Sequence, residues 1–195
     1  MNAVPSVSES FRAPLCGVLA FGSLIWDRRE LTKLEMVGEV ACMTPWPVEF
    51  ARSSRRRNWA PTLVRVRAEV GDRVKARVLV YRNEPGVVRD ALAESEDIDL
   101  RKFPKNVEAC EVPGLAVQPI WYTALCLNID DLRPECLARL AIASVKPCPQ
   151  LNGIVYLRRC LELGVRTRLS DDYLAEILRI SGKATLLEAE NWAVK

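Results

Sequence analysis

The pair Gly22-Ser23 ends a short apolar run over residues 16–21, which is typical of a buried strand. Glycine at a strand end lets a ligand approach the backbone closely. Neighbouring backbone N–H groups that point the same way can bind an anion. An ordinary strand followed by an ordinary turn explains the same residues, so this pair by itself does not identify a binding site.

A group of acidic residues is the second feature that suits chemistry. Glu94, Glu96 and Asp97 follow an apolar, helix-like pattern that ends at Leu92. The sequence contains no histidine, which excludes Ser–His and Cys–His nucleophile systems and histidine-ligated zinc. A partly buried carboxylate has a raised pKa and is the natural general base in such a chain. A solvated helix end is the alternative explanation of these acids.

The elements that must position these residues indicate an α+β fold. Strand-like patterns dominate residues 16–128, and helix-like patterns dominate the rest. This segregation predicts a small, curved or closed mixed β-sheet with peripheral helices. At 49% hydrophobic and 27% charged residues, the 195-residue chain has a globular composition. We expect one domain over residues 15–195, preceded by a flexible arm over residues 1–14.

Two segments with alternating polarity flank the pair Gly71-Asp72. Valine or alanine occupies every second position over residues 64–70 and again over residues 74–80. This pattern predicts a β-hairpin with one buried face. A nearly continuous apolar stretch over residues 117–128 predicts a central strand. Helices are expected over residues 85–97, 130–143 and 151–163, and from an N-cap at Ser170.

Cysteine usage and the N-terminal residues favour a cytoplasmic protein. The seven cysteines are scattered and none forms a Cys-x-x-Cys pair, which is typical of reduced, mostly buried thiols. The first ten residues lack the charged-then-apolar profile of a signal peptide. No apolar run approaches the ~20 residues that span a membrane, so we expect no membrane partner.

Three segments in order carry a resemblance to the γ-glutamylcyclotransferase superfamily. Phe21-Gly22-Ser23-Leu24 resembles its Tyr-Gly-Ser-Leu loop, and the added Ile25-Trp26 is similar to its glutathione-degrading ChaC branch. The segment over residues 92–98 resembles its Leu-Asp-x-x-Glu-Gly motif, whose glutamate falls on Glu96. Residues 156–164 and 172–174 look like its closing helix pair. The resemblance covers roughly residues 15–180.

The resemblance implies a barrel-like cyclotransferase that releases 5-oxoproline from glutathione, a γ-glutamyl amino acid or a γ-glutamyl amine. It implies no metal and no organic cofactor. Glu96 is then the catalytic base, with Glu94 as a rival for that role. The γ-glutamyl-binding loop consists of Phe21, Gly22, Ser23, Leu24 and Ile25.

Arg55 and Tyr122 complete the candidate site. Arg55 lies in a basic run over residues 52–57, and guanidinium groups suit the carboxylate of a peptide-like leaving group. A solvated loop and a nucleic-acid patch are the alternatives for this run. The six acids over residues 83–99 argue against nucleic acid. Tyr122 lies inside the expected central strand, so its hydroxyl belongs either to the pocket or to the core.

Three departures from the superfamily motifs keep a second function open. Phe21 stands where the superfamily has tyrosine, and Ala93 and Asp97 replace the residues that flank the glutamate. Residues 52–57 match the Arg-Gly region of the ChaC branch only loosely. A non-catalytic small-molecule-binding protein of the same fold is therefore the alternative to the enzyme. The leaving group and the oligomeric state stay open, with a homodimer as one option.

Overall fold

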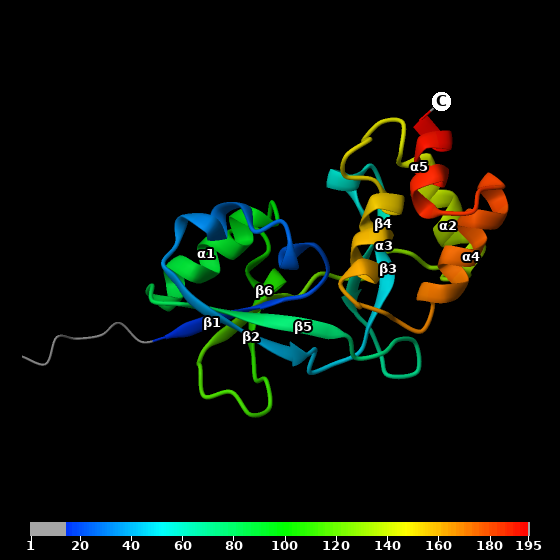
Figure 1. Ribbon diagram of the computed structural model, residues 1–195. Helices are drawn as coiled ribbons and strands as arrows, with labels where there is room; N and C mark the ends of the chain where they lie inside the picture. Colours follow the sequence, from blue (N-terminus) through cyan, green and yellow to red (C-terminus); the bar gives the residue numbers. More distant parts are fainter. Residues whose placement is uncertain (1–14, 195) are drawn as a thin grey trace, which may run out of the picture.

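The computed structural model describes residues 15–194, and its larger sheet is mixed (Figure 1). The strand order is β2-β5-β1-β7-β6. β1 runs parallel to β7 and antiparallel to β5, and the other pairs are antiparallel. The strands in this sheet are β1 (Cys16–Ala20), β2 (Met36–Met43), β5 (Lys75–Tyr81), β6 (Val107–Cys110) and β7 (Ile120–Thr123).

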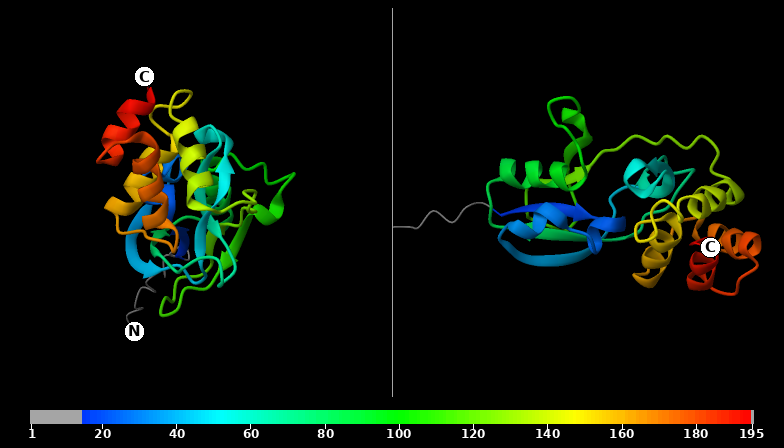
Figure 2. Two further views of the ribbon diagram at one scale, coloured as in Figure 1. Left: turned by 90° about the vertical axis from the view of Figure 1, so that its right-hand side faces the viewer. Right: turned by 90° about the horizontal axis from the view of Figure 1, so that it is seen from above.

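A second, two-stranded sheet lies beside four of the α-helices. Its strands are β3 (Val48–Ser54) and β4 (Ala60–Arg65), which pair antiparallel. The helices gathered around it are α2 (Pro134–Ala143), α3 (Gly153–Glu162), α4 (Ser170–Ser181) and α5 (Leu186–Val194). Figure 2 shows α1 (Pro85–Ser95) on one face of the larger sheet, away from these helices.

β1 is buried along its whole length because both of its faces are covered. Leu19 faces a large core that also contains Phe50 of β3 and Leu157 of α3. Val18 faces a smaller core beneath α1, with Leu92. The strand therefore delivers the residues after Ala20 to the boundary between the two parts of the molecule.

The expectation of an α+β fold with a mixed sheet is confirmed. The described strands form no closed barrel, because β2 and β6 are the two free edges of the larger sheet. Among residues 15–194, no helix has both the length and the apolar character needed to cross a membrane. The arm expected over residues 1–14 lies outside the described residues.

The predicted hairpin at Gly71-Asp72 is wrong. β4 pairs with β3, whereas β5 pairs with β1 and β2, so the two alternating segments belong to different sheets. The connection between them folds back on β3, where Asp72 forms a bridge with Val48. Alternation shows that one face of a strand is buried, but it does not identify the neighbouring strand.

The predicted helices are present with shifted ends. The helix expected from residue 130 begins at Pro134, and α3 begins at Gly153. Ser170 is not the N-cap of α4, because it already lies in the first turn and its hydroxyl accepts the Thr167 N–H at 2.8 Å. The strand expected over residues 117–128 is only the four residues of β7, after which the chain crosses to the second sheet.

Candidate functional site

The turn after β1 has the backbone geometry that its glycine suggested. Gly22 has φ +57°, a left-handed conformation that favours glycine. It opens the 3-10 turn η1 (Gly22–Ile25), after which the N–H groups of Trp26 and Asp27 donate to Ser23 O at 3.0 and 2.8 Å. The N–H groups of Gly22 and Ser23 precede the first hydrogen bond of such a turn and have no partner within it.

The apolar side chains of the turn anchor it on both sides of the sheet. Phe21 is 7% exposed in the large core, and Leu24 is 3% exposed in the core under α1. Ile25 packs against both cores, and Ser23 is partly exposed. Phe21 and Leu24 can therefore meet a ligand only through their backbone atoms.

Glu96 is held at the C-terminal end of α1 by a Schellman motif. The N–H of Asp97 donates to Glu94 O at 3.2 Å, and the N–H of Ile98 donates to Ala93 O at 2.8 Å. Asp97 has φ +57°, the conformation that glycine adopts without strain. The motif glycine of the resemblance falls on this position, so Asp97 keeps the geometry at a conformational cost.

The end of α1 is fastened to the loop that follows β1. The Ser95 hydroxyl donates to Arg28 O at 3.3 Å. Ser95 O accepts hydrogen bonds from Arg29 at 3.5 Å and from Arg56 at 3.3 Å. Ser95 is 1% exposed, so the residue next to Glu96 is fixed against both the loop and the basic run.

The Glu96 carboxylate is partly buried and lacks a partner among residues 15–194: no hydrogen bond or ion pair reaches it within this part of the chain. Burial raises the pKa of Glu96, and nearby Asp27 raises it further, whereas the positive charges of Arg56 and Arg57 oppose the shift. The negative end of the α1 dipole also disfavours the anion. Glu94, its rival, is exposed.

The basic run places Arg56 and Arg57, rather than Arg55, beside Glu96. The three arginines form the 3-10 turn η3 (Arg55–Arg57), in which successive side chains diverge. Arg56 pairs with Asp27 at 2.7 Å. Arg57 is 4% exposed and lies 4.8 Å from the ring centroid of Tyr156. Arg55 is exposed and lies over Trp59 instead, so the structure does not bring it to Glu96.

Tyr156 is a residue of this site that the sequence did not reveal. Its ring lies 5.6 Å from Trp26, and a Cβ built on Gly22 would be 2.2 Å from its hydroxyl. The negative charge of Glu96 contributes to raising the pKa of Tyr156, although burial is the main cause. The sequence showed Tyr156 only as part of a helix, because no local pattern relates it to a turn far away in the chain.

Tyr122 lies on a different surface from Glu96. Its hydroxyl donates to Glu108 at 2.9 Å and accepts from Arg65 at 3.3 Å, and its ring is 4.2 Å from that of Trp46. These residues line a groove of about 710 Å³ whose lining contains neither Glu96 nor Gly22. The expected contribution of Tyr122 to the Gly22 site is therefore not seen.

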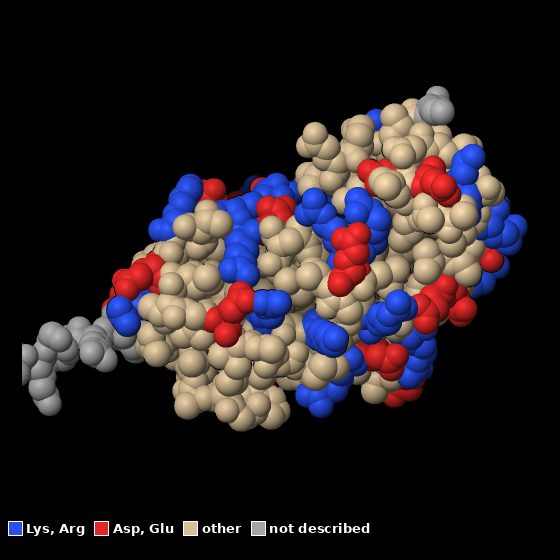
Figure 3. All heavy atoms as spheres, viewed as in Figure 1, with Lys and Arg blue, Asp and Glu red and all other residues tan. Residues whose placement is uncertain are grey.

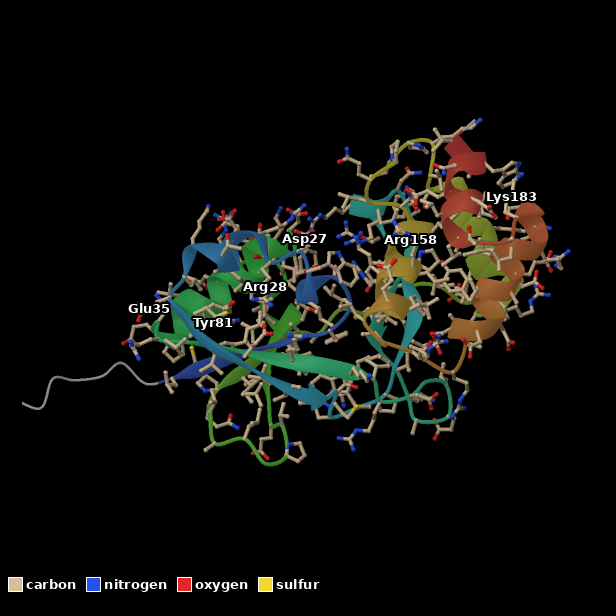
Figure 4. All side chains as sticks on the ribbon, viewed as in Figure 1. Asp27, Arg28, Glu35, Tyr81, Arg158 and Lys183 are labelled. Atoms are coloured by element: carbon tan, nitrogen blue, oxygen red, sulfur yellow. The ribbon has the colours of Figure 1, made fainter. Side chains whose placement is uncertain are left out.

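The site lies where the sheet part and the helical part of the molecule face each other. Figure 4 shows Asp27 on the side of the sheet part that faces α3, the helix that carries Arg158. Basic and acidic side chains are interspersed over the face in Figure 3, with no broad surface of one sign. Within residues 15–194, no group of three or more Cys, Asp or Glu side chains could hold a metal ion.

Comparison of the chain with protein-family models, with curated proteins and with solved structures finds no match in any of the three. The likeness of the Gly22 loop and the Glu96 segment to the γ-glutamylcyclotransferases thus rests on the sequence motifs. We base the functional proposal on those motifs together with the geometry around Glu96.

Proposed function

We propose that this protein is a γ-glutamylcyclotransferase-like enzyme in which Glu96 is the general base and acid. The observation that carries the proposal is a partly buried carboxylate that has no partner among residues 15–194, next to a serine that is hydrogen-bonded to the loop after the Gly22 turn. A buried carboxylate without a partner is costly, and a bound ammonium group would compensate that cost. The α-ammonium of a γ-glutamyl unit is such a group.

The turn at Gly22 supplies the second half of the substrate site. The N–H groups of Gly22 and Ser23, which have no partner within the turn, would bind the substrate carboxylate or the oxyanion that develops on the γ-carbonyl. Phe21 and Leu24 hold this backbone in place through their buried side chains. The loss of the tyrosine hydroxyl at position 21 is compatible with this role, because the backbone binds the ligand.

The reaction is an intramolecular aminolysis. Glu96 accepts a proton from the α-ammonium, and the freed amine attacks the γ-carbonyl carbon to form the new C–N bond of 5-oxoproline. The bond from that carbon to the leaving nitrogen then breaks. Two protons leave the α-nitrogen in all, and Glu96 delivers both in turn to the leaving amine, so charges and atoms balance. Because the amine and the carbonyl belong to one molecule, correct positioning of the substrate supplies much of the reduction in activation free energy.

The electrostatic environment suits Glu96 to both steps. Burial raises its pKa, which makes the carboxylate a stronger proton acceptor. The nearby charges of Arg56 and Arg57 oppose that shift and favour the ionised form that must accept the proton. Arg56 forms its ion pair with Asp27. Its charge therefore acts on Glu96 from nearby, and the Glu96 carboxylate stays available to a substrate.

The direct test compares Glu96→Gln with Glu94→Gln. We expect wild type to release 5-oxoproline from glutathione or from simple γ-glutamyl amino acids. Glu96→Gln should reduce kcat by about 10²–10⁴-fold, as for loss of a general base, whereas exposed Glu94 should be replaceable. Equal activity of Glu96→Gln and wild type would remove Glu96 from this role. Thermal stabilisation by γ-glutamyl compounds without any turnover would favour the non-catalytic binding protein.

A further inference from the structure

The hydroxyl of Tyr156 occupies the space in which a side chain at residue 22 would begin. A Cβ built on Gly22 would lie 2.2 Å from this oxygen and 3.3 Å from the ring carbon that bears it. Tyr156 comes from α3, and Gly22 follows β1. The helical part of the molecule thus contributes a polar atom directly to the turn, and Gly22 permits this approach.

The hydrogen bonding of this hydroxyl is incomplete. The Leu63 N–H donates to the Tyr156 oxygen at 3.3 Å. A tyrosine hydroxyl can also donate its own proton, but among residues 15–194 that proton has no acceptor. Tyr156 is only 3% exposed, so bulk water does not readily satisfy it. A buried donor that lacks an acceptor is left to find one, and a ligand oxygen at the neighbouring Gly22 turn would supply it.

The ring of Tyr156 is held in place from several sides. The Arg57 guanidinium lies 4.8 Å from its centroid, and the rings of Trp26 and Phe50 lie at 5.6 and 6.2 Å. Burial raises the pKa of Tyr156 well above the ordinary tyrosine value. The hydroxyl therefore stays protonated at neutral pH and can act as a donor but not as a base.

We propose that the Tyr156 hydroxyl donates a hydrogen bond to a substrate oxygen bound at the Gly22-Ser23 turn. This inference rests on the proposed cyclotransferase function, in which that turn binds the α-carboxylate or the developing oxyanion. The hydroxyl adds a side-chain donor to the two backbone N–H groups. A donor that is already fixed and desolvated stabilises charge without reorganisation during the reaction.

The test compares Tyr156→Phe with Tyr173→Phe as a matched control. Tyr173 is fully buried, and its ring packs 5.2 Å from Phe50. Its hydroxyl lacks a partner among the described residues, whereas the Tyr156 hydroxyl accepts from the Leu63 N–H. Both variants lose one buried hydroxyl, but only Tyr156 lies at Gly22. We expect Tyr156→Phe to lower kcat/KM for 5-oxoproline release at least tenfold and Tyr173→Phe to change it less than twofold.

The kinetic parameters show whether Tyr156 binds the α-carboxylate or the γ-carbonyl oxygen of the substrate. A raised KM with unchanged kcat assigns the bond to the α-carboxylate, and a lowered kcat assigns it to the acyl oxygen. Unchanged kcat and KM in Tyr156→Phe would overturn the proposal, as would equal losses in both variants. All measurements are made well below the thermal midpoint of each variant, so that reduced stability is not mistaken for reduced binding.

Calorimetric titration with 5-oxoproline distinguishes this inference from the proposed function. If wild type binds 5-oxoproline but turns over no γ-glutamyl substrate, the cyclotransferase function fails. Tenfold weaker binding by Tyr156→Phe, with Tyr173→Phe unchanged, would still support the donor role. Equal binding by wild type and Tyr156→Phe would contradict it. If wild type neither turns over substrate nor binds 5-oxoproline, both proposals are overturned.

Discussion

Arg56 forms a 2.7 Å ion pair with Asp27, and this pair connects the basic run after β3 to the loop after β1. The two side chains are only 19% and 25% exposed, so solvent screens them less than a surface pair. Arg56 also donates to Ser95 O at 3.3 Å. One guanidinium thus joins three segments around Glu96 and influences its charge.

Arg56→Gln should move the acid limb of the activity profile to higher pH. In the proposed mechanism turnover requires ionised Glu96, so kcat/KM should fall as the pH drops below the pKa of this group. The charge of Arg56 holds that pKa down against burial, and removing it leaves Asp27 with only its longer ion pair to Arg29 at 3.8 Å. Both effects raise the pKa of Glu96. The measurement is kcat/KM against pH.

Arg55→Gln is the matched control for this profile. Arg55 is the neighbour of Arg56 in the same turn, but it is exposed and lies over Trp59. We expect its profile to match wild type. A shift of the Arg56→Gln limb to lower pH, or an equal shift in both variants, would contradict the assigned coupling.

Gly22→Ala should destabilise the protein, and Tyr156→Phe should relieve part of that loss. The added Cβ would meet the Tyr156 hydroxyl at 2.2 Å. The backbone at residue 22 has φ +57°, a conformation that costs alanine about 1–2 kcal/mol. Tyr156→Phe alone should cost about 1–3 kcal/mol because the buried Leu63 N–H loses its acceptor. Denaturant unfolding of both single variants and the double variant gives the coupling free energy. Strict additivity would show that the two residues do not meet.

Asp97→Gly and Asp97→Ala form a pair that isolates the backbone strain next to Glu96. Both remove the carboxylate that lies 3.6 Å from Arg29, an exposed contact of small value. Only glycine relieves the left-handed conformation at φ +57°. We expect the glycine variant to exceed the alanine variant in unfolding free energy by about 1 kcal/mol. Equal unfolding free energies of the two variants would contradict the assignment of backbone strain to Asp97.

Glu49 should make stability depend on pH in the direction opposite to an exposed, paired carboxylate. It is fully buried, and it accepts hydrogen bonds from Thr167 at 2.6 Å, from its neighbour Phe50 at 2.9 Å and from Leu169 at 3.2 Å. Burial nevertheless raises its pKa in the folded state. The folded protein therefore favours the protonated form more than the unfolded chain does.

The contribution of Glu49 is consequently full below the unfolded pKa of about 4.3 and is lost as the pH rises through the higher folded pKa. Glu49→Gln keeps the shape of the side chain and does not titrate. We expect the difference in unfolding free energy between wild type and Glu49→Gln to favour wild type less as the pH increases across this window. A constant difference would contradict the raised pKa.

The individual elements could be predicted from the sequence because their signals are local. Apolar periodicity indicated β1, α1 and the later helices, and Gly22 indicated the turn that ends β1. The hairpin at Gly71 failed because alternation specifies a buried face and leaves the partner strand to long-range packing. The strand before residue 128 was predicted too long because the apolar residues after β7, such as the 54% exposed Leu127, belong to a half-buried to exposed crossing segment that resembles a strand in sequence.

The sequence by itself excluded histidine-based chemistry and drew attention to the carboxylates. The absence of histidine left a carboxylate as the natural base, and the motifs favoured Glu96 over Glu94. Only the tertiary structure decided which side chains surround it. Arg56 rather than Arg55 lies there because a 3-10 turn directs successive side chains apart, and Tyr156 meets Gly22 because α3 packs against the end of β1. Such contacts join residues distant in the chain, and no local pattern records them.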